Sequence, residues 1–312
     1  MAQDSDAEDR SLLVVLLEAH QGLWSQLNGD NVSGEEHRHL TIHGFLQQVL
    51  VFINTYLSLN DANQVAVIAA TSTSSALLHA SSSLLHASSS LLGATTKQPA
   101  AETSSNPSQE ILANLADLLR IQKEHPGVAA GPALLSGGLS RGLCLINKAR
   151  VSARAGGKRS ARPRMLCLQG SPDATQHYIA VMNAIFAAQR SEVVVDACML
   201  ASTDSTFLQQ AAHLTGGIYM RPKQRSALLQ YLLTIYCPDS SSRSHLQLPQ
   251  PLGVDFRASC FCHRRAIDVG YICSVCLSIF CESVSECTTC GTDFSKGRMP
   301  AAKRKAGNSL DA

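Results

Sequence analysis

The chain has 312 residues, of which 45% are hydrophobic and 16% are charged, and its formal net charge is +2. This length allows one sizeable core and a small additional module, and the near-neutral charge excludes a polyanion binder that uses its whole surface. We find no signal-type segment and no apolar run of the ~18 residues that a membrane helix needs, so we expect no membrane association. In a reducing compartment, clustered cysteines more often bind metal than form disulfides.

The first half of the chain alternates between apolar runs and amphipathic segments. The runs "LLVVLLEA" (12–19) and "NQVAVIAA" (63–70) are typical of strands covered on both faces. Between them, residues 41–59 place apolar side chains at helical spacing. Two further helices are predicted here, over 109–122 with Ser108 as the N-cap and over about 132–149.

The second half continues the alternation. Short apolar strands are predicted at 164–170, 192–200 and 218–220, and helices at 173–190, 205–217 and 224–236. The second of these helices ends at a pair of glycines, which is a common C-terminal signal. Repeated strand–helix alternation favours an α/β fold with a doubly wound, mainly parallel sheet, which we expect over residues 10–237.

Several segments do not follow this alternation. The Ser/Leu-rich stretch 71–107 contains a seven-residue "SSxLLHA" repeat with too few copies for a coiled coil, and we interpret it as a low-complexity insertion. Residues 148–164 are predicted to form a basic loop, 238–257 a linker, and 293–312 a basic disordered tail.

Seven of the eleven cysteines lie between residues 258 and 292. Cys273 and Cys276 form one CxxC pair, and Cys287 and Cys290 form another. Two such turns supply four thiolates, which suits a tetrahedral Zn²⁺ ion. A site with four protein ligands has no open position for water, so it is structural rather than catalytic. The spacing therefore predicts a C4 zinc finger over 258–292.

Four further residues leave two alternatives open. Cys260, Cys262, His263 and Cys281 could form a second zinc site, which would make the module a cross-braced, two-zinc one. Alternatively, the three cysteines pack as small apolar residues around a single zinc ion. Buried free thiols or a redox CxxC pair suit this segment less well, because it has little else to bury and neither pair starts a helix after a strand.

The predicted sheet lacks the usual signs of an enzyme. Neither GxGxxG nor GxxxxGK[ST] follows the first strand, and no GxSxG motif occurs. His39 and His43 are four residues apart, but "HLTIH" lacks the glutamate of HExxH. The glycine-rich "SGGLSRG" (136–142) fits neither phosphate-loop pattern, and we interpret it as a helix-packing feature. We therefore predict that the chain is not an enzyme.

Together, the segments "LLVVLLEA", "QVAVIAA", "FLQQAAHLTGGIYM" and "VDFRASCFCHRRAIDVGYICSVCLSIFC" resemble the smaller von Willebrand A-type, C4 zinc-finger subunit of the transcription and repair factor TFIIH. The resemblance covers most of 10–292, fails over 71–107 and is weak over 148–163. It implies a nuclear, non-catalytic subunit of the TFIIH core complex. Such a subunit would bind the larger A-type subunit and act in RNA polymerase II transcription initiation and nucleotide excision repair.

Many A-type domains bind Mg²⁺ through a DxSxS loop. The corresponding positions here are Glu18, His20 and Gly22, so both hydroxyl ligands are missing. Asp173 offers another carboxylate, but two acids without the hydroxyls make a poor site. We therefore expect Zn²⁺ and no Mg²⁺, and we interpret the A-type domain as a protein-binding scaffold.

Two basic segments support a rival hypothesis, a free-standing zinc-dependent nucleic-acid-binding protein. The alternative is that they are simply a solvated loop and a disordered tail, and then any nucleic-acid contact is weak or indirect. A tail of this composition also suits nuclear import. The basic residues are Arg150, Arg154, Lys158, Arg159, Arg162 and Arg164 in the first segment, and Lys296, Arg298, Lys303, Arg304 and Lys305 in the tail.

Overall fold

The computed structural model contains two compact units, Met1–Asp255 and Phe256–Ala312, which we call the sheet unit and the cysteine unit. The tail beyond Phe294 lies outside the described residues, so the prediction of disorder there stays a prediction. No helix in the part of the chain that the structure describes is both long and apolar enough to cross a membrane. The described residues are 11–19, 40–82, 84, 106–124, 133–157, 161–174, 177–249, 254, 256–263, 265–276 and 278–294.

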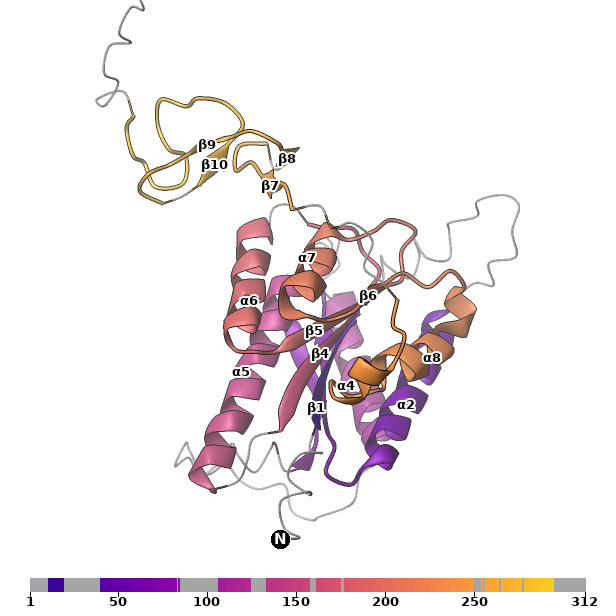
Figure 1. Cartoon of the computed structure of the whole chain (residues 1–312). Helices are drawn as coiled ribbons and strands as arrows, with labels where there is room; N and C mark the ends of the chain where they lie inside the picture. The colour runs from indigo at the N-terminus through magenta and orange to yellow at the C-terminus, as the bar shows by residue number, and fades with distance from the viewer. Residues whose placement is uncertain are drawn as a thin grey trace, which may run out of the picture. The chain divides into compact units, whose positions relative to one another are not determined.

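The sheet unit is built on a six-stranded sheet with the order β3-β2-β1-β4-β5-β6 (Figure 1). β1 pairs in parallel with β2 and β4, and the parallel pairing continues through β5 to β6, whereas β3 is antiparallel to β2. The predicted doubly wound, mainly parallel sheet is confirmed. The strands are Ser11–Glu18 (β1), Gln64–Ala70 (β2), Ser75–Ala80 (β3), Arg162–Gln169 (β4), Val194–Met199 (β5) and Tyr219–Met220 (β6).

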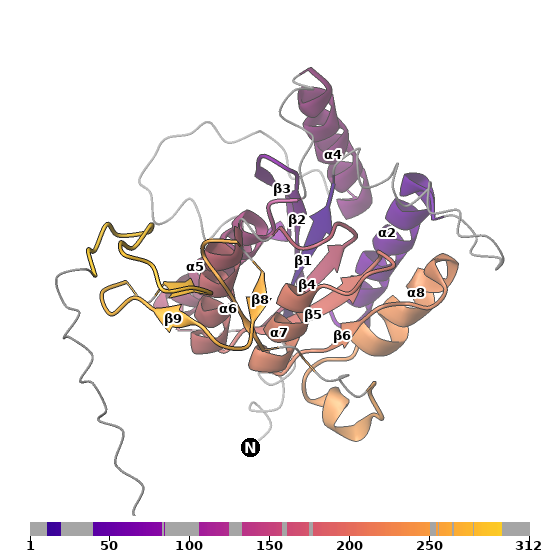
Figure 2. The same ribbon diagram turned by 90° about the horizontal axis from the view of Figure 1, so that it is seen from above.

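Helices cover both faces of this sheet (Figures 1 and 2). One face carries Ile42–Leu59 (α2), Pro107–Glu124 (α4) and Leu228–Tyr231 (α8). A turn of π-helix, Leu232–Tyr236, extends α8. The other face carries Leu135–Ala155 (α5), Tyr178–Arg190 (α6) and Thr206–Thr215 (α7). In β1, Leu13 and Val15 pack into the first core and Val14 into the second. Successive strand side chains point to opposite faces, so one continuous apolar run supplies both cores.

Small residues bring α5 close to the sheet. A Cβ atom added to Gly138 would lie 2.4 Å from Leu16 Cδ1, and one added to Gly142 would lie 2.7 Å from Met165 Cε. Both distances are shorter than a carbon–carbon contact allows. The glycines of "SGGLSRG" thus let the helix pack against β1 and β4, in agreement with their interpretation as a helix-packing feature.

Helix ends follow local capping chemistry. The side chain of Ser205 accepts a hydrogen bond from the N–H of Leu208 at the start of α7, and Gly216 ends that helix with a φ of 70°. At α4, Asn106 Oδ1 accepts from the N–H of Ser108 at 3.1 Å, and Pro107 is the first helical residue. The cap is therefore Asn106, and the prediction of Ser108 was wrong by two positions.

The predicted low-complexity insertion 71–107 contains a strand. β3 lies inside it and pairs with β2, which would otherwise present an unpaired edge. Two contacts from α4 hold β3: Asn114 Nδ2 donates to the carbonyl of Leu78 at 2.7 Å, and Glu110 Oε2 lies 2.5 Å from His79 Nδ1. The serine-rich composition of residues 71–107 therefore gave no indication of this short edge strand. Most of the later repeat lies outside the described residues.

The predicted basic loop 148–164 is also partly regular. α5 continues to Ala155, because no helix breaker occurs before Gly156 and Gly157. β4 begins at Arg162, so only a short connection separates the helix from the strand.

Arg164 does not belong to a surface patch. Its side chain is 1% exposed and donates to the carbonyl oxygens of Tyr236 at 3.1 Å and Pro238 at 2.7 Å. Arg243 from the predicted linker 238–257 forms two hydrogen bonds, 2.8 and 2.6 Å long, with the fully buried carboxylate of Asp196. A buried charge needs such partners. The first residues of the predicted linker therefore pack as part of the sheet unit.

Candidate metal centres

The cysteine unit repeats one local turn three times. Each turn begins with a cysteine whose backbone N–H donates to the carbonyl oxygen five residues further on. The pairs are Cys260 to Arg265 (3.0 Å), Cys273 to Ser278 (2.9 Å) and Cys287 to Thr292 (2.8 Å). The flanking strands are Ala258–Ser259 (β7) with Ala266–Ile267 (β8), and Tyr271–Ile272 (β9) with Ile279–Phe280 (β10); a single bridge, Glu286–Asp293, flanks the third turn. Such turns present the side chains of their first residues to a common point.

The second and third turns bring the two CxxC pairs together. The sulfur atoms of Cys273, Cys276, Cys287 and Cys290 all lie within 4.8 Å of one another. The distance from Cys273 to Cys290 is 3.8 Å, and that from Cys276 to Cys287 is 3.5 Å. Sulfurs around a tetrahedral zinc ion, with Zn–S of ~2.3 Å, are separated by ~3.8 Å. We call this set the C4 group, and its geometry could hold a metal ion.

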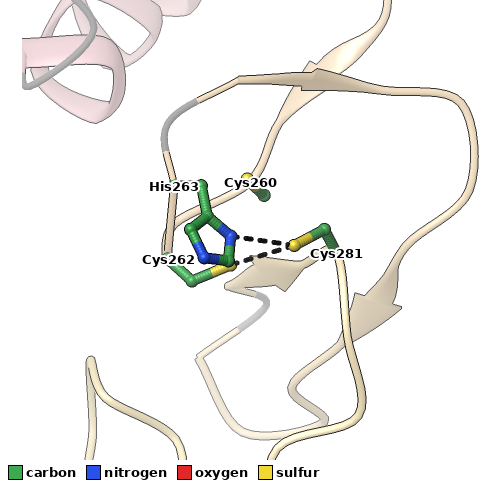
Figure 3. A group of neighbouring side chains, drawn as sticks. All are labelled: Cys260, Cys262, His263 and Cys281. Atoms are coloured by element: carbon green, nitrogen blue, oxygen red, sulfur yellow. Dashed lines mark hydrogen bonds between the residues drawn. The ribbon is translucent and has the colours of Figure 1, made fainter.

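The remaining four predicted ligands also meet (Figure 3). Cys262 Sγ lies 3.4 Å from Cys281 Sγ, and His263 Nδ1 lies 3.1 Å from the same sulfur. The first turn supplies Cys260, Cys262 and His263, and Cys281 comes directly after β10. We call this set the Cys/His group. Cys262 is exposed and Cys281 is only partly buried, which does not fit the alternative that these cysteines pack as small apolar residues.

The two groups alternate along the chain. The first turn belongs to the Cys/His group, the second to the C4 group, then Cys281 to the Cys/His group and the third turn to the C4 group. An arrangement of this kind is cross-braced, so neither group can form from a continuous half of the unit. Three sulfurs with an imidazole, like four sulfurs, are ligand sets that zinc accepts.

Hydroxyl groups surround the C4 sulfurs. Ser278 Oγ lies 3.0 Å from Cys276 Sγ, and Thr292 Oγ1 lies 2.9 Å from Cys290 Sγ. Hydrogen bonds from Ser278 lower the pKa of Cys276 to about 6. Thiolate is the metal-binding form, so Ser278 favours ligation by Cys276 at neutral pH. At Cys290, hydrogen bonds from Thr292 tend to lower the pKa, but the neighbouring thiols of Cys276 and Cys287 raise it to about 11. Sequence reasoning missed these hydroxyls, although each lies two residues after the second cysteine of a CxxC pair.

Cys260 shows the same tendency in the Cys/His group. Burial alone would raise the pKa of its thiol, but hydrogen bonds from the backbone of Arg265 and His263 lower it to about 6. Backbone N–H donors at a turn thus stabilise the thiolate before any metal is present.

The apolar core of the cysteine unit is very small. Its buried members are Cys273, Phe280 and Cys287, with Phe261 and Phe294 among the partly buried neighbours. Two of the three buried residues are members of the C4 group, so the core and the site overlap. A unit of this size with so little apolar burial needs a metal or another covalent or coordinate link to fold.

In the sheet unit, the acids that correspond to an A-type metal loop have protein partners. Glu18 Oε2 accepts from the backbone N–H groups of Gly170 at 2.6 Å and Ser171 at 2.8 Å. Asp173 Oδ2 accepts from Thr206 Oγ1 at 2.8 Å and from the N–H of Phe207 at 3.1 Å. Glu18 therefore joins the end of β1 to the loop after β4.

The predicted helix 173–190 begins only at Tyr178, and Asp173 contributes to the start of α7 instead. Several other predicted positions lie outside the described residues, namely His20, Gly22, His39, Lys158 and Arg159.

A parallel sheet in this order, with helices on both faces, defines a von Willebrand A-like domain, and here it is accompanied by a cysteine-rich unit that could hold metal. The solved "TFIIH p34 N-terminal Domain" has a similar fold, with a TM-score of 0.56 and 24% identity, and the match covers 73% of this chain and 98% of that one. This likeness concerns the fold.

Curated relatives extend the similarity to the whole chain. The "General transcription and DNA repair factor IIH subunit TFB4" of Arabidopsis thaliana is 42% identical, with 98% of each chain covered. The "General transcription factor IIH subunit 3" of Dictyostelium discoideum is 39% identical over 85% of this chain and 71% of the relative. The family model "Transcription factor Tfb4" matches residues 10–291, and the chain belongs to this family. It is not a family of enzymes, and the predicted resemblance is confirmed.

Proposed function

We propose that this chain is a non-catalytic subunit of the TFIIH core complex, located in the nucleus, where it acts in RNA polymerase II transcription initiation and nucleotide excision repair. The observation that carries this proposal is the 42% identity to a TFIIH subunit over 98% of both chains. Similarity of that extent includes the cysteine unit as well as the sheet unit. The acids of the altered metal loop are engaged by backbone and hydroxyl donors, which suits a scaffold.

The proposed partner of the sheet unit is the larger A-type subunit of the same complex, with the cysteine unit adding a second protein contact. Support for the second contact comes from four exposed large apolar residues within a short segment. Val269 is 82% exposed, Tyr271 56%, Ile272 64% and Val275 66%. A small unit that leaves so many large apolar side chains in water is suited to cover them with another protein.

We further propose that both groups hold Zn²⁺ as a structural ion. Cys273, Cys276, Cys287 and Cys290 would hold one ion, and Cys260, Cys262, His263 and Cys281 a second. Zinc bound by four protein ligands contributes folding free energy and has no open position for a substrate. The ions would therefore fix the shape of a binding surface.

Affinity purification of the tagged chain from nuclear extract tests the proposed assembly. We expect the larger A-type subunit and other TFIIH subunits to co-purify and to remain bound in about 1 M salt, where the Debye length is about 3 Å and surface ion pairs are screened. Absence of TFIIH subunits would overturn the proposed function. Loss of the larger subunit at moderate salt would contradict an apolar interface.

The contact of the cysteine unit is tested separately. The double variant Ile272→Ser/Val275→Ser removes two exposed apolar side chains of this unit, and we expect a lower yield of co-purified subunits. Ile121→Ser on α4 is the control, because Ile121 is an exposed apolar residue too, at 54%, but belongs to the sheet unit. An unchanged yield with the double variant would show that this surface makes no contact.

A further inference from the structure

We propose that the C-terminal ends of α5 and α6, together with the first residue of β4, form a surface that binds the phosphate backbone of duplex DNA. This surface, the basic end, consists of Arg150, Arg154, Arg162 and Arg190. The proposal goes beyond the subunit role proposed above and does not depend on it.

The two helices carry charge of a single sign. α5 has 21 residues, which include Arg141, Lys148, Arg150 and Arg154 but no acid. α6 has 13 residues, with Arg190 as its charged residue and again no acid. The whole chain is nearly balanced, with 26 basic and 24 acidic residues. The two helices therefore carry five basic residues and no acid within a nearly neutral protein.

A specific contact brings the basic residues together. Arg150 donates from Nη1 to the carbonyl of Ser191 at 2.6 Å and from Nη2 to that of Glu192 at 3.5 Å. These bonds join the last turns of α5 to the residues that directly follow Arg190, and α5 and α6 lie side by side (Figure 1). Arg162 starts β4, so all these groups lie where the parallel strands begin.

Most of these cations have no carboxylate partner in the part of the chain that the structure describes. Among the described residues, no carboxylate lies within ion-pair distance of Arg154, Arg162 or Arg190, whereas Arg120, Arg164, Arg221, Arg243 and Arg257 do pair with carboxylates. Arg154, Arg162 and Arg190 are exposed. Glu192 is the neighbouring acid in the turn after α6, and its side chain is also exposed.

Helix dipoles account for only part of this arrangement. A cation in the last turn of a helix is favoured by the partial negative charge of that end, which applies to Arg154 and Arg190. The same effect does not explain Arg162, which is in a strand. An external anion that reaches the whole set accounts for all of its members.

The chemistry of the basic end favours a nucleic-acid backbone over an acidic protein. Arginine is enriched both at interfaces between proteins and at phosphate contacts, but protein interfaces have an apolar centre, whereas phosphate contacts repeat arginine and lysine side chains. All four members are arginines, whose planar fork fits a phosphate bidentately. One exposed aromatic, Phe186, lies one turn before Arg190. Single-strand binding normally needs several such platforms, so duplex is the better fit.

The test measures binding of the zinc-loaded full chain to a fluorescent DNA duplex of about 20 base pairs as salt is varied. The variant is Arg154→Gln/Arg190→Gln, and the control, Arg120→Gln/Lys223→Gln, removes the same charge from other elements. We expect wild-type affinity to fall steeply with salt, and the variant to reduce the slope of log K against log[salt] by about 2, since each lost phosphate contact removes about 0.9. The control should keep the wild-type slope.

Three results would overturn the proposal: no wild-type binding at about 50 mM salt, equal reductions of the slope in variant and control, or equally strong competition by phosphatidylserine vesicles. Circular dichroism and co-purification of TFIIH subunits should be unchanged in the variant. A failure to bind DNA with normal co-purification would leave the proposed function intact and remove only this inference.

Discussion

The sheet unit and the cysteine unit of this chain differ in how much apolar surface they bury. The sheet unit buries two apolar layers, one on each face of the sheet, with most strand residues inaccessible to water. Among the described residues of the cysteine unit, the apolar core has only three buried members, of which two are cysteines of the C4 group. Apolar burial of ~25 cal/mol per Å² can maintain the first unit, but so small a core cannot maintain the second. Coordination of the proposed metal ions by the cysteines would supply the difference.

The polar groups of the two units differ in the same way. In the sheet unit the buried carboxylates already have partners within the chain, as Asp196 has in Arg243 and Glu18 has in the backbone of Gly170. In the cysteine unit the thiols face one another in two groups, each of which could hold a metal ion. The buried carboxylates of the sheet unit are therefore paired within the chain, whereas the cysteine unit, as proposed above, needs metal ions from solution.

The largest expected effect follows from the cross-braced arrangement. Cys281 is positioned by β10, and β10 belongs to the hairpin whose turn carries Cys273 and Cys276. We expect Cys287→Ser/Cys290→Ser to abolish both metal sites, because the hairpin that presents Cys281 loses its anchor. Cys260→Ser should abolish only the site of the Cys/His group. Mass spectrometry of the native protein and elemental analysis count the ions: two for wild type, one for Cys260→Ser and none for the double variant.

The circular dichroism of the sheet unit should survive in both cases. Structural zinc sites have apparent binding free energies of about 10–16 kcal/mol, so their loss unfolds a unit of this size. If Cys260→Ser removed both ions, the C4 group would depend on the Cys/His group. If the whole chain melted with the double variant, the sheet unit and the cysteine unit would not be independent in the way that the comparison requires.

The next effect concerns the buried charges of the sheet unit. Asp196→Asn leaves two guanidinium groups, of Arg164 and Arg243, in a buried position without a counter-charge. Breaking a buried pair by removing one partner costs about 3–5 kcal/mol. Asp204→Asn is the matched control, since its pair with Arg221 is about 40% exposed on each side and such a pair is worth about 0.2–1 kcal/mol. In urea unfolding, Asp196→Asn should therefore have a clearly lower midpoint than Asp204→Asn. Similar midpoints for the two variants would contradict the buried network.

Much of this architecture could be predicted from the sequence, because each layer follows a local rule. The continuous apolar run around Leu13 and Val14 predicted a strand covered on both faces, and the helical spacing of 41–59 predicted α2. The two CxxC pairs predicted the C4 group, which the structure brings together. In each case the spacing of residues close together in the sequence was enough to predict the element or the group.

What could not be predicted depends on contacts between distant residues. β3 lies in a serine-rich stretch and is a strand because β2 offers an edge for it, which no local pattern reports. Arg164 belongs to a basic stretch of sequence, yet its side chain is buried, because it pairs with Asp196 and donates to the carbonyl of Tyr236. Asp173 lies before α6 but serves α7, since the fold places the two loops together. These assignments needed three-dimensional neighbours.

A smaller effect is expected at Glu18. Its carboxylate accepts two backbone N–H groups that are buried and would otherwise lack this acceptor. Glu18→Ala should lower the free energy of unfolding by about 1–3 kcal/mol, whereas Glu18→Gln keeps one acceptor oxygen and should lose less. Added Mg²⁺ should leave the melting temperature of wild type unchanged. A melting temperature that rises with Mg²⁺ in wild type but not in Glu18→Ala would show that this carboxylate still serves a metal site.

The smallest effect tests the segment that leads out of the sheet unit. Burial tends to raise the pKa of Asp239, but hydrogen bonds from the hydroxyl of Ser241 and from Ser242 lower it to about 2. Because the folded-state pKa lies below that of the unfolded chain, its contribution is present above about pH 4 and lost as the pH falls towards 2.

Asp239 is largely solvated, so screening reduces its contribution to a few tenths of a kcal/mol. We expect faster amide exchange at Ser242 in Asp239→Asn than in wild type near pH 6, and a difference that narrows as the pH approaches 2. Exchange at Val195, within β5, serves as the control and should be the same in both proteins. A difference that stayed constant with pH would mean that the side chain acts through its shape rather than its charge, and an equal change at Val195 would mean that the segment and the sheet open together.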